Sequence, residues 1–148
     1  AVVALGWGQQ EAKTKDANIF YVKSVPHDWL FPHMAGAVHH GGAGTTATSL
    51  RHALPTLVVP FGGDQPFWAE RVYAAGCGPK AIPRDKLTAE NLAEGLRALI
   101  SNPEYTRNAA CIGEALRNEH GCANAADLIE KAVWDWENGN PAQDGMNI

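Results

Sequence analysis

Short apolar runs alternate with stretches of helical periodicity along most of this chain. We predict four strands and a weaker fifth, at residues 2–5, 18–22, 37–40, 56–60 and 80–82. Helices are predicted between and after them, at residues 28–33, 46–54, 64–75, 88–100, 103–120 and 123–136. This alternation is typical of βα repeats, in which successive strands lie parallel in one sheet. The sequence therefore predicts an α/β fold with a largely parallel sheet and flanking helices.

The composition is that of one soluble globular domain, with 45% hydrophobic and 19% charged residues among 148. A net charge of −4 argues against binding of nucleic acid, because Lys and Arg neither dominate nor form a run. Pro55 and Pro60 interrupt the best apolar stretch, so none reaches the roughly 20 residues that cross a bilayer. We expect a cytoplasmic protein with no transmembrane segment, peripheral to membranes where it meets them at all.

A glycine turn flanked by histidines and threonines is the strongest functional signal. It runs from His39 to Thr46, HHGGAGTT, between a predicted strand and a predicted helix. Backbone N–H groups at a helix N-terminus lack helical partners, and with the helix dipole they favour an anion such as phosphate. The glycines alone would equally suit a tight connection, but His40 and the hydroxyls of Thr45 and Thr46 add further hydrogen-bond donors. We therefore predict an anion site, with His39 packing or hydrogen-bonding beneath the loop.

Polar residues also follow the two neighbouring predicted strands. Val25-Pro26-His27 comes after one of them, and the segment 61–65, FGGDQ, comes after the other. Ligands bind at the carboxyl ends of open parallel sheets, so these segments should meet the glycine turn in one crevice. Asp64 and Gln65 supply the hydrogen-bonding groups that sugar hydroxyls need, although Asp64 equally suits a helix N-cap.

These motifs carry a family resemblance. The segment 25–69, VPHDWLFPHMAGAVHHGGAGTTATSLRHALPTLVVPFGGDQPFWA, resembles the donor-binding region of nucleotide-sugar-dependent glycosyltransferases of the two-domain GT-B type. It is most similar to the sterol 3-beta-glucosyltransferase branch, and the similarity extends over roughly the first 100 residues. The resemblance implies a Rossmann-like domain, the C-terminal half of a GT-B fold, that binds UDP-glucose for transfer of glucose to a lipid or sterol hydroxyl.

The resemblance also implies a role for each matching position. The residues that would bind the UDP-sugar are Val25, His27, His40, Gly42, Ala43, Gly44, Thr45, Thr46, Asp64 and Gln65. His40 and the backbone after it would contact the diphosphate. Asp64 and Gln65 would hold the glucosyl hydroxyls. The backbone around Val25 would meet the uracil edge, and His27 would lie near the ribose.

Two positions depart from the plant members of the family. Ser24 stands where they place a tryptophan that stacks on the base, and Thr48 where they place a ribose-binding glutamate. Trp7 is a candidate stacking surface in their stead. The family's reaction implies no metal ion and no cofactor, since UDP-glucose is the donor substrate.

The resemblance further implies that this chain is an incomplete C-terminal domain. We expect residues 1–137 to form the nucleotide-sugar-binding domain and 138–148 a loose polar tail, with the domain's central first strand missing. No catalytic residue is expected in the fragment, because the family's general base comes from the N-terminal acceptor domain. The isolated 148 residues should therefore transfer no glucose, and they should fold poorly because the remaining strands cannot pair across the gap.

Three other functions remain open at this stage. Residues 42–47, GAGTTA, satisfy the loose GxGxxA form of a dinucleotide-binding oxidoreductase, with Asp64 about twenty residues on. A metal site is a weaker alternative, prompted by His27, His33, His39 and His40. Adjacent strand residues face opposite ways, which argues against joint ligation by the last two. A non-catalytic module that binds a nucleotide sugar or a protein partner is the third.

Overall fold

The computed structural model describes residues 1–6 and 16–139, which fall into two compact units. The first unit, Ala1–Leu116, contains the four strands and the helices that surround them. The second unit begins at Arg117 and contains the last helix. The helix α5 (Pro103–Asn118) ends just beyond the boundary of the first unit.

The strands form two separate parallel pairs. Strand β1 (Val2–Ala4) pairs with β2 (Phe20–Val22), and β3 (Ala37–His39) pairs with β4 (Thr56–Val58). Within the described ranges no ladder joins the two pairs. All four strands lie inside the segments predicted from the sequence, and each is shorter than predicted. The parallel α/β class is therefore confirmed.

The fifth strand, predicted weakly at 80–82, does not form. The Ile82 N–H donates to the Val58 carbonyl at 3.0 Å, and the Arg84 N–H donates to the Pro60 carbonyl at 3.1 Å. These bonds hold the segment against the end of β4. Pro79 and Pro83 flank it and carry no N–H, so a continuous ladder has no donors there.

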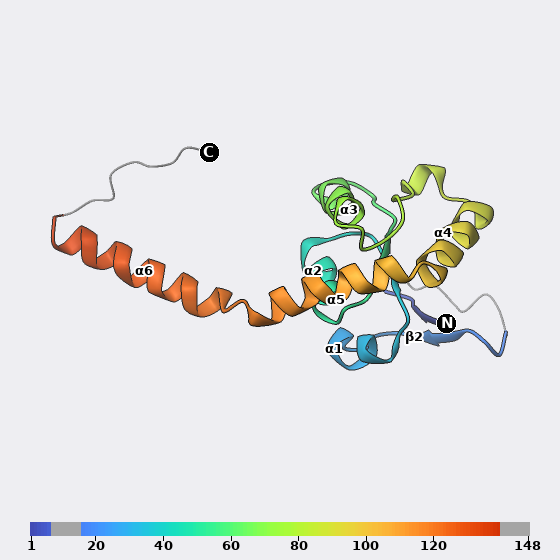
Figure 1. Cartoon of the computed structure of the whole chain (residues 1–148), viewed down its shortest axis with the longest axis horizontal. Helices are drawn as coiled ribbons and strands as arrows, with labels where there is room; N and C mark the ends of the chain where they lie inside the picture. Colours follow the sequence, from blue (N-terminus) through green and yellow to red (C-terminus); the bar gives the residue numbers. More distant parts are fainter. Residues whose placement is uncertain (7–15, 140–148) are drawn as a thin grey trace. The chain divides into compact units, whose positions relative to one another are not determined.

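Helices follow the strands in the first unit (Figure 1). They are α1 (His27–Leu30), the 3₁₀ turn η1 (Phe31–His33), α2 (Ala43–Arg51), α3 (Gln65–Ala74), the 3₁₀ turn η2 (Arg84–Lys86), α4 (Ala89–Ser101) and α5. Gly76 ends α3 as predicted, with φ +63° and its N–H bonded to the Tyr73 carbonyl at 2.9 Å. The first helix, predicted to begin at Asp28, begins one residue earlier, at His27.

The core is built on β4, whose residues are all buried. One cluster joins Val58 to Ala69 and Val72 of α3 and to Ala109 of α5. From α4, Leu99 is also buried, and a Cβ at Gly95 would lie 2.9 Å from Leu57 of β4. Because the strand is covered on both sides, it reads as a continuous apolar run in the sequence. This packing fixes the carboxyl ends of β3 and β4, where the candidate site lies.

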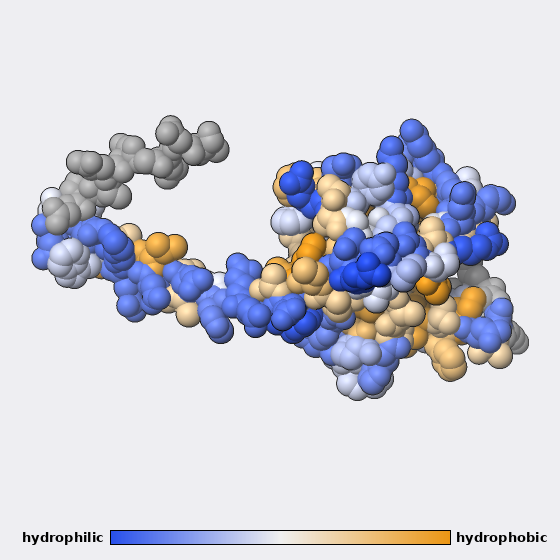
Figure 2. Space-filling model, in the orientation of Figure 1, coloured by the Kyte–Doolittle hydropathy of each residue, from blue (hydrophilic) through white to orange (hydrophobic). Residues whose placement is uncertain are grey.

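The second unit is dominated by α6 (Gly121–Glu137). Its large apolar side chains are exposed, namely Leu128, Ile129, Val133, Trp134 and Trp136. Figure 2 shows apolar atoms beside hydrophilic ones along this helix. None of the described helices is long and apolar enough to cross a membrane.

Candidate functional site

The glycine turn is shorter than the sequence indicated, because α2 begins at Ala43 instead of Thr46. Strand β3 ends at His39, so three residues connect strand to helix. Gly42 is the N-cap, in an extended conformation at φ −62° and ψ 144°. Its carbonyl accepts the first helical hydrogen bond from the Thr46 N–H at 2.9 Å. The first turn of the helix therefore contains Ala43, Gly44 and Thr45, whose N–H groups precede that bond.

These N–H groups remain open. In the described part of the chain, no acceptor bonds the N–H of Gly42, Ala43, Gly44 or Thr45, and no side chain caps the helix. A Cβ built on Gly44 would meet no atom within 4 Å, so the first turn faces open space. Unpaired amides together with the positive end of the helix dipole favour an anion, so this terminus is the candidate site that the sequence predicted.

His40 lies over the same helix end. Its side chain is exposed, and a Cβ added to Gly42 would lie 2.5 Å from its Nε2 atom. The imidazole therefore lies against the N-cap residue. A ring nitrogen at this place can donate to the anion that the amides bind.

The His39 side chain faces the interior of the protein, whereas the His40 side chain faces solvent. Its Nδ1 atom accepts the Gly41 N–H at 3.0 Å, which confirms the prediction of a hydrogen-bonding residue beneath the loop. Burial lowers the pKa of His39 to about 4, with further lowering from His40 and His27. Among the described residues no group of three His, Cys, Asp or Glu side chains could hold a metal ion, so the metal alternative finds no support in this geometry.

Gly41 joins the turn to the next strand end. Its φ is +89°, a conformation that residues with a side chain rarely adopt. A Cβ here would lie 2.5 Å from Cγ1 of Val58 and 3.2 Å from the Gln65 carbonyl. The glycine turn thus packs directly on β4 and on the start of α3, which brings the Asp64–Gln65 segment to the same edge.

Asp64 and Gln65 are both occupied by contacts within the chain. The Gln65 Oε1 atom accepts the N–H groups of Phe61 at 2.8 Å and Gly62 at 3.2 Å. Asp64 occupies the N-cap position of α3 without capping it, and its Oδ2 atom accepts the indole N–H of Trp68 at 2.8 Å. Trp68 therefore orients an exposed carboxylate. Sequence reasoning missed this partner, although the spacing of four residues on a helix is a signal that could have found it.

The two threonines differ in exposure. Thr46 is 3% exposed, and its hydroxyl is buried with no partner among the described residues. Thr45 is half-buried at the open end of α2. Of the two hydroxyls, that of Thr45 lies nearer to solvent and to an incoming anion.

A hollow lies at the carboxyl ends of the other strand pair, β1 and β2. It measures about 420 Å³ and is lined by Ala4, Gly6, Lys23, Ser24, Val25 and His27. Val25 and His27 were predicted for this site, whereas the lining by Lys23, Ala4 and Gly6 was not. Trp7, the candidate stacking surface, lies outside the described residues.

His27, which lines this hollow, lies close enough to the glycine turn to help lower the pKa of His39. The His27 ring stacks on Phe31, with centroids 4.7 Å apart and planes 8° apart. Asp28 binds His52, the C-cap of α2, with 3.0 Å between Oδ1 and Nε2. His52 is thus a structural contact between α1 and α2. The hollow, the helix end and the Asp64 loop share the carboxyl edge of the strands.

This arrangement defines a class of protein: a Rossmann-like α/β domain, a fold in which ligands bind at the carboxyl ends of the strands. Comparison with known proteins names the family. Residues 2–130 match the family described as Erythromycin biosynthesis protein CIII-like, C-terminal domain. The match covers most of the chain, so the chain belongs to this family of GT-B glycosyltransferase domains.

Similar sequences include sterol 3-beta-glucosyltransferases. One from Arabidopsis thaliana is 44% identical over 132 residues, covering 88% of this chain and 21% of the relative. Another from Pichia angusta is 43% identical over 112 residues, covering 76% of this chain and 9% of the relative. The resemblance to the sterol branch is confirmed. The chain spans about a fifth or less of the length of these relatives.

Similar solved structures are glycosyltransferases. That of kitacinnamycin superimposes with a TM-score of 0.76 at 28% identity, covering 88% of this chain and 34% of the other. The glycosyltransferase VinC, solved in complex with dTDP, gives a TM-score of 0.65 at 33% identity, covering 69% of this chain and 26% of the other. The GT-B prediction is therefore confirmed, and the oxidoreductase alternative is not favoured.

Proposed function

We propose that this chain is the sugar-donor-binding domain of an enzyme that transfers glucose from UDP-glucose to the hydroxyl of a sterol or related lipid. The observation that carries the proposal is the open N-terminus of α2, with unpaired amides and the His40 ring over Gly42. The names of the sterol 3-beta-glucosyltransferase relatives support the choice of sugar and acceptor.

The diphosphate would sit at this helix end. The amides of Gly42, Ala43, Gly44 and Thr45 would donate to its oxygens, with the imidazole of His40 beside them. The similar glycosyltransferase VinC was solved in complex with dTDP, and this nucleoside diphosphate supports the class of ligand proposed here. Hydrogen bonds to the diphosphate that strengthen as negative charge develops on the departing UDP would stabilise the transition state. The N-terminus of α2 would contribute to catalysis in this way.

The remaining groups would hold the two ends of the sugar nucleotide. The nucleoside would occupy the hollow of about 420 Å³, between Val25 and His27. The carboxylate of Asp64 and the amide NH₂ of Gln65 would face the glucosyl hydroxyls, with the Asp64 carboxylate oriented by Trp68. Thr46 would support the shape of the helix end and would not donate to the ligand, since its hydroxyl is buried and its N–H donates to the Gly42 carbonyl.

The chemistry needs a base to deprotonate the acceptor hydroxyl. We infer that this base and the acceptor pocket lie in a separate acceptor domain of the whole enzyme. The proposal includes no cofactor and no metal ion, and it places the enzyme in the cytoplasm or at a membrane surface.

Replacing His40 tests the proposed function in the intact enzyme. We expect His40→Ala to lower glucose transfer by roughly 100-fold or more, as loss of a charge-stabilising hydrogen-bond donor does. The assay would offer UDP-glucose with a panel of sterol, flavonoid and macrolide acceptors. His120→Ala is the control, because this exposed histidine lies at the start of α6 in the second unit. Unchanged transfer in His40→Ala, at an unchanged melting temperature, would contradict the proposal.

A glycine pair tests the position of the diphosphate. Gly44→Ala adds a methyl group in open space beside the unpaired amides, so we expect weaker UDP binding without loss of stability. Gly121→Ala is the matched control, because this glycine also begins a helix and an added Cβ would meet nothing nearer than 3.9 Å. Calorimetric titration with UDP measures both. Equal affinity in the two variants would place the diphosphate elsewhere.

A further inference from the structure

We propose that His39 is a positioning residue of the sugar-donor site: by accepting the Gly41 N–H on Nδ1 it fixes the turn that directs the amides of α2 outward. This inference rests on the proposed function, because it assigns a purpose to the shape of the same turn. His39 itself would not touch the ligand.

The hydrogen bond closes a small ring made of the His39 side chain and the backbone between His39 and Gly41. A side-chain acceptor on one residue binds the N–H two residues on, which is the geometry that Asn and Asp use in an Asx turn. On its other side, Gly41 packs against Val58, where a Cβ would come within 2.5 Å. Gly41 is therefore held between the imidazole and β4, and its φ of +89° follows from both contacts.

The direction of α2 depends on this glycine. Gly42 follows directly as the N-cap, and the unpaired N–H groups begin with its own. His40, between His39 and Gly41, is carried by the same turn, and its ring lies against Gly42. Loss of the His39 contact would disturb both the amides and the second imidazole.

The hydrogen bond also selects the form of the ring. Since Nδ1 accepts, the imidazole is neutral and carries its proton on Nε2. That Nε2 atom is buried and has no partner in the described part of the chain. A protonated ring would place an N–H donor against the Gly41 N–H. Burial lowers the pKa of His39 to about 4, which disfavours the protonated form. The ring thus acts as a fixed acceptor.

Two substitutions in the intact enzyme separate positioning from packing. His39→Asn places an oxygen where Nδ1 lies, and so retains the acceptor. His39→Leu retains a similar buried volume without an acceptor. We expect His39→Leu to weaken UDP binding by about tenfold, the effect of one lost hydrogen bond, and His39→Asn to restore most of it. Uridine, which lacks the phosphates, should bind all three proteins alike.

The outcomes divide clearly. Equal UDP affinity in His39→Leu and the parent enzyme would overturn the positioning role while leaving the proposed function intact. Parallel losses of UDP and uridine affinity, or failure of His39→Asn to recover, would show a merely structural residue and also overturn it. A parent enzyme that binds no UDP would overturn the proposed function itself, and this inference with it.

Discussion

At the residue scale, two adjacent histidines have opposite properties. His39 is buried enough that its Nε2 atom has no contact with solvent, whereas His40 is exposed. Their ring centroids lie 6.3 Å apart. The alternation of side chains along a strand separates them, since consecutive residues face opposite sides of the sheet. One ring can therefore serve the backbone while the other serves a ligand.

The low pKa of His39 predicts a pH-dependent stability. Above pH 6.5 the residue is neutral in both the folded and the unfolded chain. As pH falls from 6.5 toward 4, the unfolded chain takes up a proton that the folded chain excludes, so stability is lost across this window. The slope from this residue is at most about 1.4 kcal/mol per pH unit. Urea unfolding of the intact enzyme at several pH values measures it.

The control is His39→Asn, which has no titratable group at this position. Its stability should fall less steeply between pH 6.5 and 4 than that of the parent enzyme. His40 and His27, which contribute to lowering the pKa of His39, are present in both proteins. Identical pH profiles would mean that His39 titrates normally.

At the element scale, the residues at the N-cap positions of two helices have different functions. Thr88 caps α4 in a capping box, accepting the Asn91 N–H at 3.2 Å while the Asn91 side chain accepts the Thr88 N–H at 2.9 Å. Asp64 stands at the N-cap of α3, and its carboxylate bonds Trp68 instead of the helix amides. The first residue stabilises its helix, whereas the second leaves an oxygen available to a ligand.

Replacing each N-cap by alanine should separate stability from binding. Thr88→Ala removes a working cap and should cost about 1 kcal/mol of unfolding free energy, with transfer activity unchanged. Asp64→Ala removes an exposed carboxylate that caps nothing, so it should cost clearly less stability and yet reduce glucose transfer. Chemical unfolding and the transfer assay are read side by side. A larger stability loss in Asp64→Ala would show that its carboxylate is structural.

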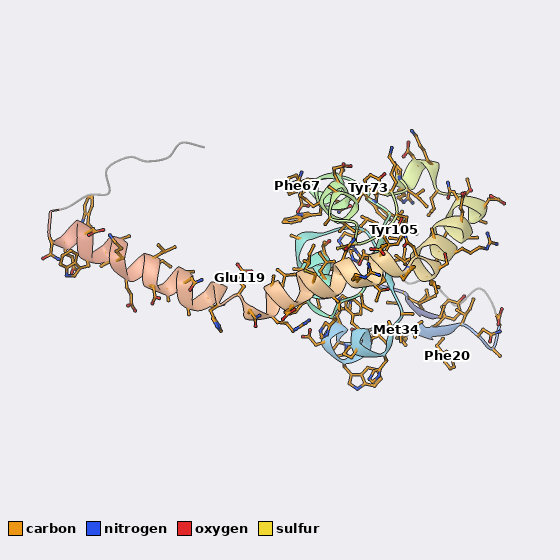
Figure 3. The ribbon with its side chains drawn as sticks, in the orientation of Figure 1. Phe20, Met34, Phe67, Tyr73, Tyr105 and Glu119 are labelled. Atoms are coloured by element: carbon orange, nitrogen blue, oxygen red, sulfur yellow. The ribbon has the colours of Figure 1, made fainter. Side chains whose placement is uncertain are left out.

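At the scale of the whole molecule, the described residues leave much apolar surface uncovered. The β1–β2 pair borders an apolar hollow of about 320 Å³, lined by Val2, Phe20, Val22, Val25, Trp29, Leu30, His33 and Met34. Phe20 and Met34 are labelled in Figure 3. Phe20 is 66% exposed and Trp29 is 64% exposed. In the second unit, the apolar side chains of α6 are exposed as well.

We expect these 148 residues in isolation to melt over a broad range and to transfer no glucose. Within the residues that the structure describes each sheet has two strands, and a two-stranded sheet is marginally stable unless further strands or helices cover it. Differential scanning calorimetry and binding of a hydrophobic dye would measure this. A sharp cooperative melt without dye binding would contradict the expectation and show that the two strand pairs support each other.

Much of the fold was predictable because its signals are local. The apolar runs located four strands, and helix punctuation such as Gly76 located the ends of helices. The start of α2 was placed three residues late, because Ala43, Gly44 and Thr45 have weak helical spacing of their own. Ile82 bonds β4 without becoming a strand, an outcome decided by the flanking prolines and by packing.

The sequence by itself determined the α/β order, the glycine turn and the identity of the polar groups after each strand. These follow from chain chemistry within a few residues. Only the tertiary structure decided which groups are free to bind: it buried the Thr46 hydroxyl, bound Asp64 to Trp68 and set His39 under Gly41. Burial and hydrogen-bond partners depend on segments that meet in space, and no local pattern records them.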